Sequence, residues 1–294
     1  MPRVTSSTGD ASFAMPASRA NDSDFCGRCR RSGRREDCLF HPDRKEKVMP
    51  AHLNHHGPVA EVTLDWQEVR NAIGPNEARE LRQALEQAVR APEVGALVLS
   101  GAGKAFCAGG NLPALLEVIR AGGKPAIHET IYTEFQGVFR AIDSSPVPVI
   151  TAVDGPAVGW GCDLALAGSA TLIGSKGWLA QGWIKAGLVP ATGGTLYTLR
   201  RAGPQAVWRM LAADRVDGPT AEQWQLAIAC EDARSAALEM AARLAALPRA
   251  ALRATRQLAS IDSFDEHLKI ALKHQADFLT DPEFEARAAK LLGR

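Results

Sequence analysis

Two glycine-rich segments, each placed between an apolar strand-like run and an apolar helical pattern, constrain the fold of this chain most strongly. The first is LSGAGKAFCAGGNL at residues 99–112, and the second is VITAVDGPAVGWGCDLAL at residues 149–166. An apolar run that stops at glycine and leads into a helix is typical of a strand-to-helix connection in an α/β protein. Backbone N–H groups at both junctions could therefore point, unpaired, into one shared space, which is a geometry for holding an oxyanion.

The periodicity of the remaining chain supports an α/β fold. Apolar runs and alternation predict strands at 59–66, 95–100, 147–153 and 170–175. Pro75 opens a helical pattern that continues to residue 91, and residues 112–142 are predicted to be helical with an interruption at AGGKPAIH. After Pro204 the pattern is almost wholly helical. We therefore expect an α/β core followed by a helical C-terminal region.

Composition and charge exclude several classes of protein. The chain has 294 residues and no continuous apolar run near eighteen residues, so a soluble protein without a membrane partner is expected. Residues 49–294 hold 24 basic against 26 acidic side chains, which argues against a general polyanion or nucleic-acid binder. Neither a secretory signal nor a disulfide framework is apparent among the six cysteines. We expect a reducing, cytoplasmic compartment.

Residues 1–50 differ in composition from the rest and are predicted to form a largely disordered extension. Within it, Cys26, Cys29, Cys38 and His41 have the spacing C-x2-C-x8-C-x2-H, and these side chains could hold a structural zinc ion. The alternative is a disordered extension without metal, with Met49 as the natural first residue. If the cluster does bind zinc, the chain could instead be an interaction or nucleic-acid protein.

Four ordered motifs resemble the crotonase (enoyl-CoA hydratase/isomerase) superfamily over about residues 53–294. They are VAEVTLDWQEVRNAI, GALVLSGAGKAFCAGGNL, VPVITAVDGPAVGWGCDLALAGSATLIG and GLVPATGGTLYTLRRAG. The resemblance implies a spiral of ββα units over residues 51–215 and a helical region of the same fold over residues 216–294. It also implies packing of the C-terminal helices on a neighbouring subunit, as a homotrimer or hexamer, and acyl-CoA substrates of fatty acid metabolism.

The same resemblance implies the site residues. The backbone amides of Ala108 and Trp160 would form an oxyanion hole for the enolate of an acyl thioester, carried by coenzyme A or by acyl carrier protein. No cofactor is implied beyond the coenzyme A of the substrate. The residues expected to contact the substrate are Phe106, Gly109, Gly110, Gly159, Gly161 and Trp183.

The acid–base positions depart from the family pattern. Hydratases of the superfamily carry two glutamates, and here Asp163 and Trp183 stand at those positions. An aspartate carboxylate lies roughly 1.3–1.5 Å farther back than that of glutamate, and a displacement on this scale can cost about a hundredfold in rate. An indole has one N–H donor and no proton to exchange near neutral pH, so Trp183 cannot act as a base. Asp163 is the candidate catalytic residue, and its alternative role is to complement a helix dipole.

Two functions therefore stay open for the body of the chain. One is a crotonase-type lyase or isomerase that uses Asp163 alone for isomerisation, hydration, elimination, C–C cleavage or decarboxylation. The other is a non-catalytic acyl-thioester-binding homologue that keeps the oxyanion hole without the glutamate pair.

Overall fold

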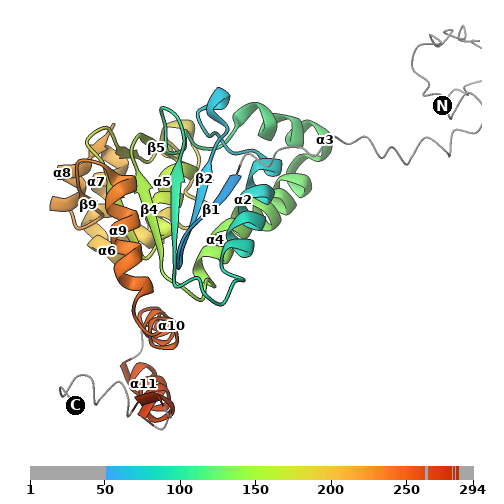
Figure 1. Ribbon diagram of the computed structural model, residues 1–294. Coiled ribbons are helices and arrows are strands. Elements are labelled where there is room, and N and C mark those ends of the chain that lie inside the picture. Colours follow the sequence, from blue (N-terminus) through green and yellow to red (C-terminus); the bar gives the residue numbers. More distant parts are fainter. Residues whose placement is uncertain (1–50, 262–263, 280, 282, 285–294) are drawn as a thin grey trace, which may run out of the picture. The chain divides into compact units, whose positions relative to one another are not determined.

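The computed structural model describes residues 51–261, 264–279, 281 and 283–284 (Figure 1). The chain divides into two units, Met1–Val48 and Met49–Arg294, and the described residues all belong to the second. The expected zinc ligands Cys26, Cys29, Cys38 and His41 lie outside the described residues.

Short strands and helices alternate along the first two thirds of the second unit. The strands are β1 (Ala51–His56), β2 (Val59–Leu64), β3 (Ala96–Gly101), β4 (Val149–Val153), β5 (Pro156–Val158), β6 (Ala170–Ile173), β7 (Trp178–Ala180), β8 (Val216–Asp217) and β9 (Ile228–Ala229). The α-helices are α2 (Pro75–Ala88), α3 (Leu112–Thr130), α4 (Gln136–Asp143), α5 (Trp160–Ala167), α6 (Gly194–Ala202), α7 (Pro204–Ala212), α8 (Gly218–Gln223), α9 (Ala233–Ala245), α10 (Arg249–Leu258) and α11 (Phe264–Leu279). Short helices of other types are η3 (Gln67–Val69), the π-helix η4 (Ile131–Phe135) and η5 (Ile184–Ala186).

The strands form two sheets. The larger has the order β1-β2-β3-β4-β6-β9 and the smaller has the order β5-β7-β8. Strands β2, β3, β4, β6 and β9 are parallel, and β1 pairs antiparallel with β2. Because the carboxyl ends of parallel strands meet at one edge, the glycine-rich segments that follow β3 and β4 begin at the same edge of the sheet.

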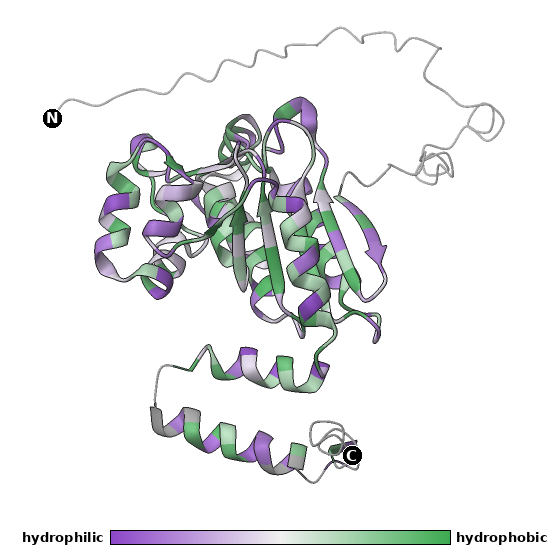
Figure 2. Cartoon of the chain, turned by 60° about the vertical axis from the view of Figure 1, so that its left-hand side comes forward, coloured by the Kyte–Doolittle hydropathy of each residue, from purple (hydrophilic) through white to green (hydrophobic). Residues whose placement is uncertain are grey.

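Helices cover both faces of the larger sheet (Figure 1). On one face, residues such as Val62, Leu99 and Val153 pack with apolar side chains of α2, α4 and α5. On the other face, the alternate positions Val98 and Ile150 pack against the alanines of α9. The strands are correspondingly apolar on both faces, and polar residues gather on the outer helices (Figure 2).

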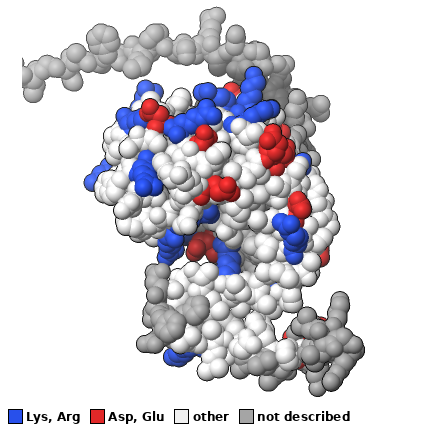
Figure 3. All heavy atoms as spheres, turned by 90° about the vertical axis from the view of Figure 1, so that its left-hand side faces the viewer, with Lys and Arg blue, Asp and Glu red and all other residues white. Residues whose placement is uncertain are grey.

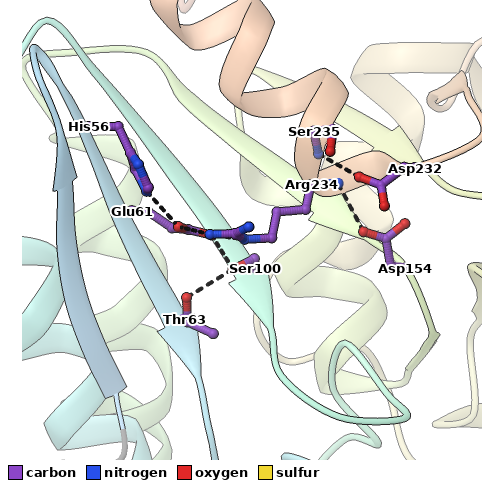
Figure 4. Close-up of polar contacts among 8 residues, drawn as sticks. All are labelled: His56, Glu61, Thr63, Ser100, Asp154, Asp232, Arg234 and Ser235. Carbon is purple, nitrogen blue, oxygen red and sulfur yellow. Dashed lines mark hydrogen bonds and ion pairs between the residues drawn. The ribbon is translucent and has the colours of Figure 1, made fainter.

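An ion pair between a buried glutamate and a half-exposed arginine attaches α9 to the sheet (Figure 4). Glu61 of β2 is fully buried, and both its oxygens accept from Arg234 of α9, at 2.6 and 2.7 Å. His56 and Ser100 also bond to this carboxylate. Although burial opposes it, hydrogen bonds from Arg234, His56 and Ser100 hold the pKa of Glu61 below its ordinary value. Asp154, which follows β4, accepts from the first two amides of α9 and caps the helix.

Two arginines one heptad apart hold α10. Arg249 donates to the carbonyl oxygens of Val89, Ala91 and Pro92 after α2. Arg256 donates to those of Ile142, Asp143 and Val147 at the end of α4. Both arginines therefore hydrogen-bond to backbone carbonyl groups at or shortly after a helix C-terminus. The next helix, α11, contacts α10.

The predicted strands at 59–66, 95–100, 147–153 and 170–175 are confirmed as β2, β3, β4 and β6. The predicted helix interruption is also present, since Gly123 has φ 57° and ψ −145° within α3. The prediction of an almost wholly helical chain after Pro204 was incomplete, because β8 and β9 add a strand to each sheet. Their two-residue length is too short for an alternating pattern. Within the part of the chain that the structure describes, no helix is long and apolar enough to cross a membrane.

Candidate functional site

The first glycine-rich turn, between β3 and α3, is held from two sides. The backbone of Cys107 pairs with β5. Its amide donates to the carbonyl oxygen of Pro156 (3.1 Å), and its carbonyl oxygen accepts from the amide of Val158 (3.0 Å). The amide of Ala108 donates in the opposite direction, to the carbonyl oxygen of Arg70 at 3.0 Å. The N–H of Ala108 is therefore engaged within the protein and is not available to a ligand.

Gly110 supplies the free amide of this turn. The carbonyl of Gly109 accepts from the amide of Ile73, and the amide of Asn111 donates to the carbonyl of Ile73, both at 2.8 Å. Because Gly110 lies between these two bonds, its own N–H points away from Ile73 and toward the side of β5. This N–H has no hydrogen-bond partner among the described residues.

The second turn joins β5 to α5 and lies against the first. Gly159 has φ 53°, a region that L-residues rarely adopt, and Trp160 is the first residue of α5. The N–H of Trp160 has no partner within the described segments, as expected for the first turn of a helix. A Cβ on Gly109 would lie 3.9 Å from this nitrogen, and a Cβ on Gly161 would lie 2.2 Å from the carbonyl oxygen of Cys107. Glycine at these positions lets the two turns approach closely enough to present both amides together.

Asp163 lies one turn farther along α5 and is fully buried. Its Oδ1 accepts from Gln181 Nε2 at 2.8 Å and its Oδ2 accepts from Thr192 Oγ1 at 2.7 Å. The carboxylate also adjoins Gly194 at the N-terminus of α6, whose backbone N–H favours the charged form. Burial raises the pKa of Asp163 to about 6, against these donors, which lower it. A buried carboxyl group that titrates near neutral pH is suited to acid–base chemistry.

The indole of Trp183 lies over both turns. Its ring atoms come within 3.6–3.8 Å of the positions that a Cβ would occupy on Gly159, and within 3.8 Å of the one on Gly110. Leu115 of α3 contacts the same position on Gly110 at 3.6 Å. Trp183 and Leu115 therefore bound the space beside the Gly110 amide.

The structure brings most of the expected substrate-contacting positions together. Gly109, Gly110, Gly159, Gly161 and Trp183 all belong to the two turns or contact them. Phe106 is 1% exposed and belongs to the main apolar core, not to the surface of the turns. In place of Ala108, the geometry assigns the free amide of the first turn to Gly110.

The side chains of two other tryptophans, Trp160 and Trp178, pack elsewhere. The side chain of Trp160 packs edge-on against Phe135 and Phe139 in the core, although its backbone N–H faces the turn. Trp178 lies under the guanidinium of Arg215. Among the described residues, no group of three or more His, Cys, Asp or Glu side chains is arranged to hold a metal ion.

Reasoning from the sequence missed Gln181 and Thr192. Both are buried, and both bond to Asp163 from 18 and 29 residues away. Each is a single polar residue in a short irregular segment, so no periodicity marks it. Their role becomes visible only when β7 and the segment before α6 pack against α5.

A cleft of about 810 Å³ lies elsewhere, among the ends of α4 and α5, the helix α6 and α10. Arg201 and Arg256 line it, but both donate to backbone carbonyl oxygens there. The guanidinium groups of both arginines are therefore already engaged by the backbone. Acidic and basic side chains are interspersed over the face shown in Figure 3, in keeping with a net charge of +1.

Comparisons with known proteins identify the family. Residues 54–288 match the model of the enoyl-CoA hydratase/isomerase family. A probable enoyl-CoA hydratase of Mycobacterium tuberculosis, echA14, is 37% identical over 251 residues, covering 82% of this chain and 96% of the relative. The 1,2-epoxyphenylacetyl-CoA isomerase of Escherichia coli is 28% identical, covering 74% of this chain and 85% of the relative.

Solved structures show the same fold. An enoyl-CoA hydratase from Polaromonas sp. JS666 superposes with a TM-score of 0.75 at 29% identity, covering 83% of this chain and 97% of the other. DspI of Pseudomonas aeruginosa superposes with a TM-score of 0.76 at 26% identity, covering 86% and 98%. The expected crotonase-like fold is confirmed, and the chain belongs to the enoyl-CoA hydratase/isomerase family.

Proposed function

We propose that this protein binds an acyl-CoA thioester with the carbonyl oxygen between the amides of Gly110 and Trp160, and stabilises the enolate that forms there. The observation that carries the proposal is the pair of amides without protein partners on two turns in direct contact. A thioester carbonyl gains negative charge when its α-carbon is deprotonated, and fixed N–H donors stabilise that charge. Relatives named for acyl-CoA substrates support the choice of carrier.

Within this proposal, Asp163 carries the proton and the reaction is an isomerisation. Asp163 is a buried carboxyl group one helical turn after Trp160, its pKa is raised by burial to about 6, and Trp183 offers no exchangeable proton. One carboxylate is sufficient to remove a proton from C2 of the acyl group and to return it at C4, so that the double bond moves and no atom is gained or lost. Addition of water by the two-glutamate route would need a second carboxylate at position 183.

A non-catalytic thioester-binding protein is the second candidate. The observation in its favour is that Asp163 is fully buried and already accepts hydrogen bonds from Gln181 and Thr192. A carboxylate held in this way serves the packing of α5 against α6 whether or not it meets a substrate.

Incubation with crotonyl-CoA and 3-enoyl-CoA in deuterium oxide separates the two candidates. The enzyme is expected to exchange deuterium into the acyl chain, and Asp163→Asn is expected to abolish exchange while retaining binding. Tight binding without exchange by the wild-type protein would establish the binder. Infrared spectra of a ¹³C-labelled thioester test the oxyanion hole, because two N–H donors lower the carbonyl stretching frequency on binding. An unshifted carbonyl would contradict the role of Gly110 and Trp160.

We further propose that the chain assembles as a homotrimer or hexamer in the cytoplasm and needs no cofactor beyond the coenzyme A of its substrate. Exposed apolar side chains on α11, Leu268 and Leu272, support assembly. Light scattering measures the oligomer. Zinc analysis of the full chain and of a chain starting at Met49 tests the Cys/His extension, and equal zinc in both would exclude a site there.

A further inference from the structure

The cleft of about 810 Å³ that α10 forms with α6 and the ends of α4 and α5 lies away from the glycine-rich turns. Pro148, Ile150 and Ala170 line it at the amino-terminal ends of β4 and β6. The glycine-rich segments follow the carboxyl ends of the parallel strands β3 and β4, so the cleft lies at the opposite edge of the sheet. Its volume is within the range of roughly 300–1,000 Å³ that small-molecule sites occupy. The cleft is therefore a cavity of ligand size outside the proposed thioester site.

Positive charge dominates the wall of this cleft. Asp143 is the one acidic side chain among the described residues that line it. Four of the lining residues are arginines: Arg200, Arg201, Arg253 and Arg256. The C-termini of α4 and α5 also meet the cleft, and each contributes roughly half a negative charge. Together with Asp143 they balance at most two of the guanidinium groups. Figure 3 shows basic side chains at a hollow of the surface above the C-terminal helices α10 and α11.

Arg201 has a buried charge that no carboxylate offsets. Burial lowers the pKa of Arg201 to about 10, and no acidic group opposes this effect. Its Nη1 and Nη2 donate to the carbonyl oxygens of Leu226 and Gly168, at 2.8 and 2.7 Å. These bonds use two of its five N–H groups, and neutral carbonyl groups leave the positive charge in place. A buried charge without a counterion is costly, so an anion that reached Arg201 would bind favourably.

Two further arginines extend this positive charge along α10. Arg256 donates to the carbonyl oxygens of Val147 and Asp143, so it too bonds to neutral groups. Arg253, about one helical turn earlier, is exposed and has no hydrogen-bond or ion-pair partner among the described residues. Because the guanidinium group presents a planar fork of donors, it can bind two phosphate oxygens at once. The arrangement suits an anion with several oxygens and more than one negative charge.

We propose that this cleft binds a small molecule that carries phosphate, through the guanidinium groups of Arg201, Arg253 and Arg256. Tyr197 and Leu252 line the same cleft and would contact the organic part of such a molecule. A phosphate ester carries about 1.5 to 2 negative charges at neutral pH, which matches several arginines better than one carboxylate does. The site does not depend on the proposed thioester chemistry, so its failure would leave that function untouched.

Titration calorimetry of the full chain with inorganic pyrophosphate, at fixed ionic strength, tests for the site. The wild-type protein is expected to bind pyrophosphate saturably and with the same affinity in the presence of butyryl-CoA. Absence of saturable binding would overturn the proposal. Displacement of pyrophosphate by butyryl-CoA would assign the anion to the binding of coenzyme A phosphates and would also overturn it. Malonate, a dicarboxylate, is expected to bind more weakly, and equal affinity would contradict the phosphate class.

Two variants at exposed positions locate the anion without removing the buried arginines. Ala259 lines the cleft and is the C-cap residue of α10, so Ala259→Glu brings a repelling charge and should weaken binding about tenfold or more. Ala246→Glu is the matched control, because Ala246 is exposed, caps α9 in the same αR conformation and lies outside the cleft lining. Arg253→Gln should weaken binding about fivefold, the effect of one exposed charge pair. Wild-type affinity in either cleft variant, or an equal loss in Ala246→Glu, would refute the assignment.

Discussion

The titration of Asp163 should make the stability of this protein depend on pH in a predictable direction. Burial raises its pKa from 3.8 to about 6 in the folded state. Between these values the folded protein holds a proton that the unfolded chain releases, so the free energy of unfolding falls as the pH rises through this window. Above about pH 6 the carboxylate is charged in both states, and the free energy of unfolding has lost the full amount that burial of the charge costs. A shift of about 2 pH units corresponds to about 3 kcal/mol in total.

Asp163→Asn removes this titration, so the difference in unfolding free energy between variant and wild type should change with pH. Integrating the linkage relation from pH 5 to pH 7 gives a change of about 1.4 kcal/mol in favour of the variant. The absolute difference at one pH also contains the altered hydrogen bonds to Gln181 and Thr192, which are present at every pH. The change with pH is therefore the informative quantity.

Urea denaturation followed by tryptophan fluorescence at pH 5, 6, 7 and 8, at one protein concentration, gives the four free energies. Asp214→Asn is the matched control. Asp214 is fully exposed, and its pKa is lowered by its hydrogen bond to Lys185, so this variant should differ from the wild type by the same amount at pH 5 and pH 7. A difference for Asp163→Asn that is also independent of pH would refute the assignment of a raised pKa to the buried carboxylate.

Three further outcomes are expected. Gly161→Ala should lower the free energy of unfolding by about 1–3 kcal/mol in thermal or urea denaturation, because its Cβ would lie 2.2 Å from the Cys107 carbonyl oxygen. Gly110→Ala, with neighbours at 3.6 Å or more, should stay near the wild type. Arg256→Met should cost about 1–3 kcal/mol through the loss of its hydrogen bonds to backbone carbonyl groups, and hydrogen exchange should show faster opening of α10. The Cys107 thiol, whose pKa burial raises to about 12, should resist iodoacetamide in the folded protein, whereas half-buried Cys230 should react, as peptide mass mapping would show.

Local sequence patterns determined the strands and glycine-rich turns that carry the site. The strands β3 and β4 and the glycine turns after them follow from apolar runs that end at glycine, since strand propensity and permissive backbone conformations depend on neighbouring residues. Four motifs in order were sufficient to indicate the fold, and the family comparison confirms it. The sequence also showed that Asp163 and Trp183 stand where the family has two glutamates.

Contacts between distant segments decided the rest. Whether Ala108 or Gly110 has a free amide depends on bonds to Arg70 and Ile73, more than thirty residues earlier, and no pattern within the turn encodes them. The pKa of Asp163 likewise depends on its complete burial and on partners that β7 and α6 bring to it. Hydrogen-bond pairing and desolvation depend on which segments pack together in the folded protein. The sequence by itself therefore determined which chemical groups this protein possesses, and the tertiary structure decided which of them are left unpaired beside the turns.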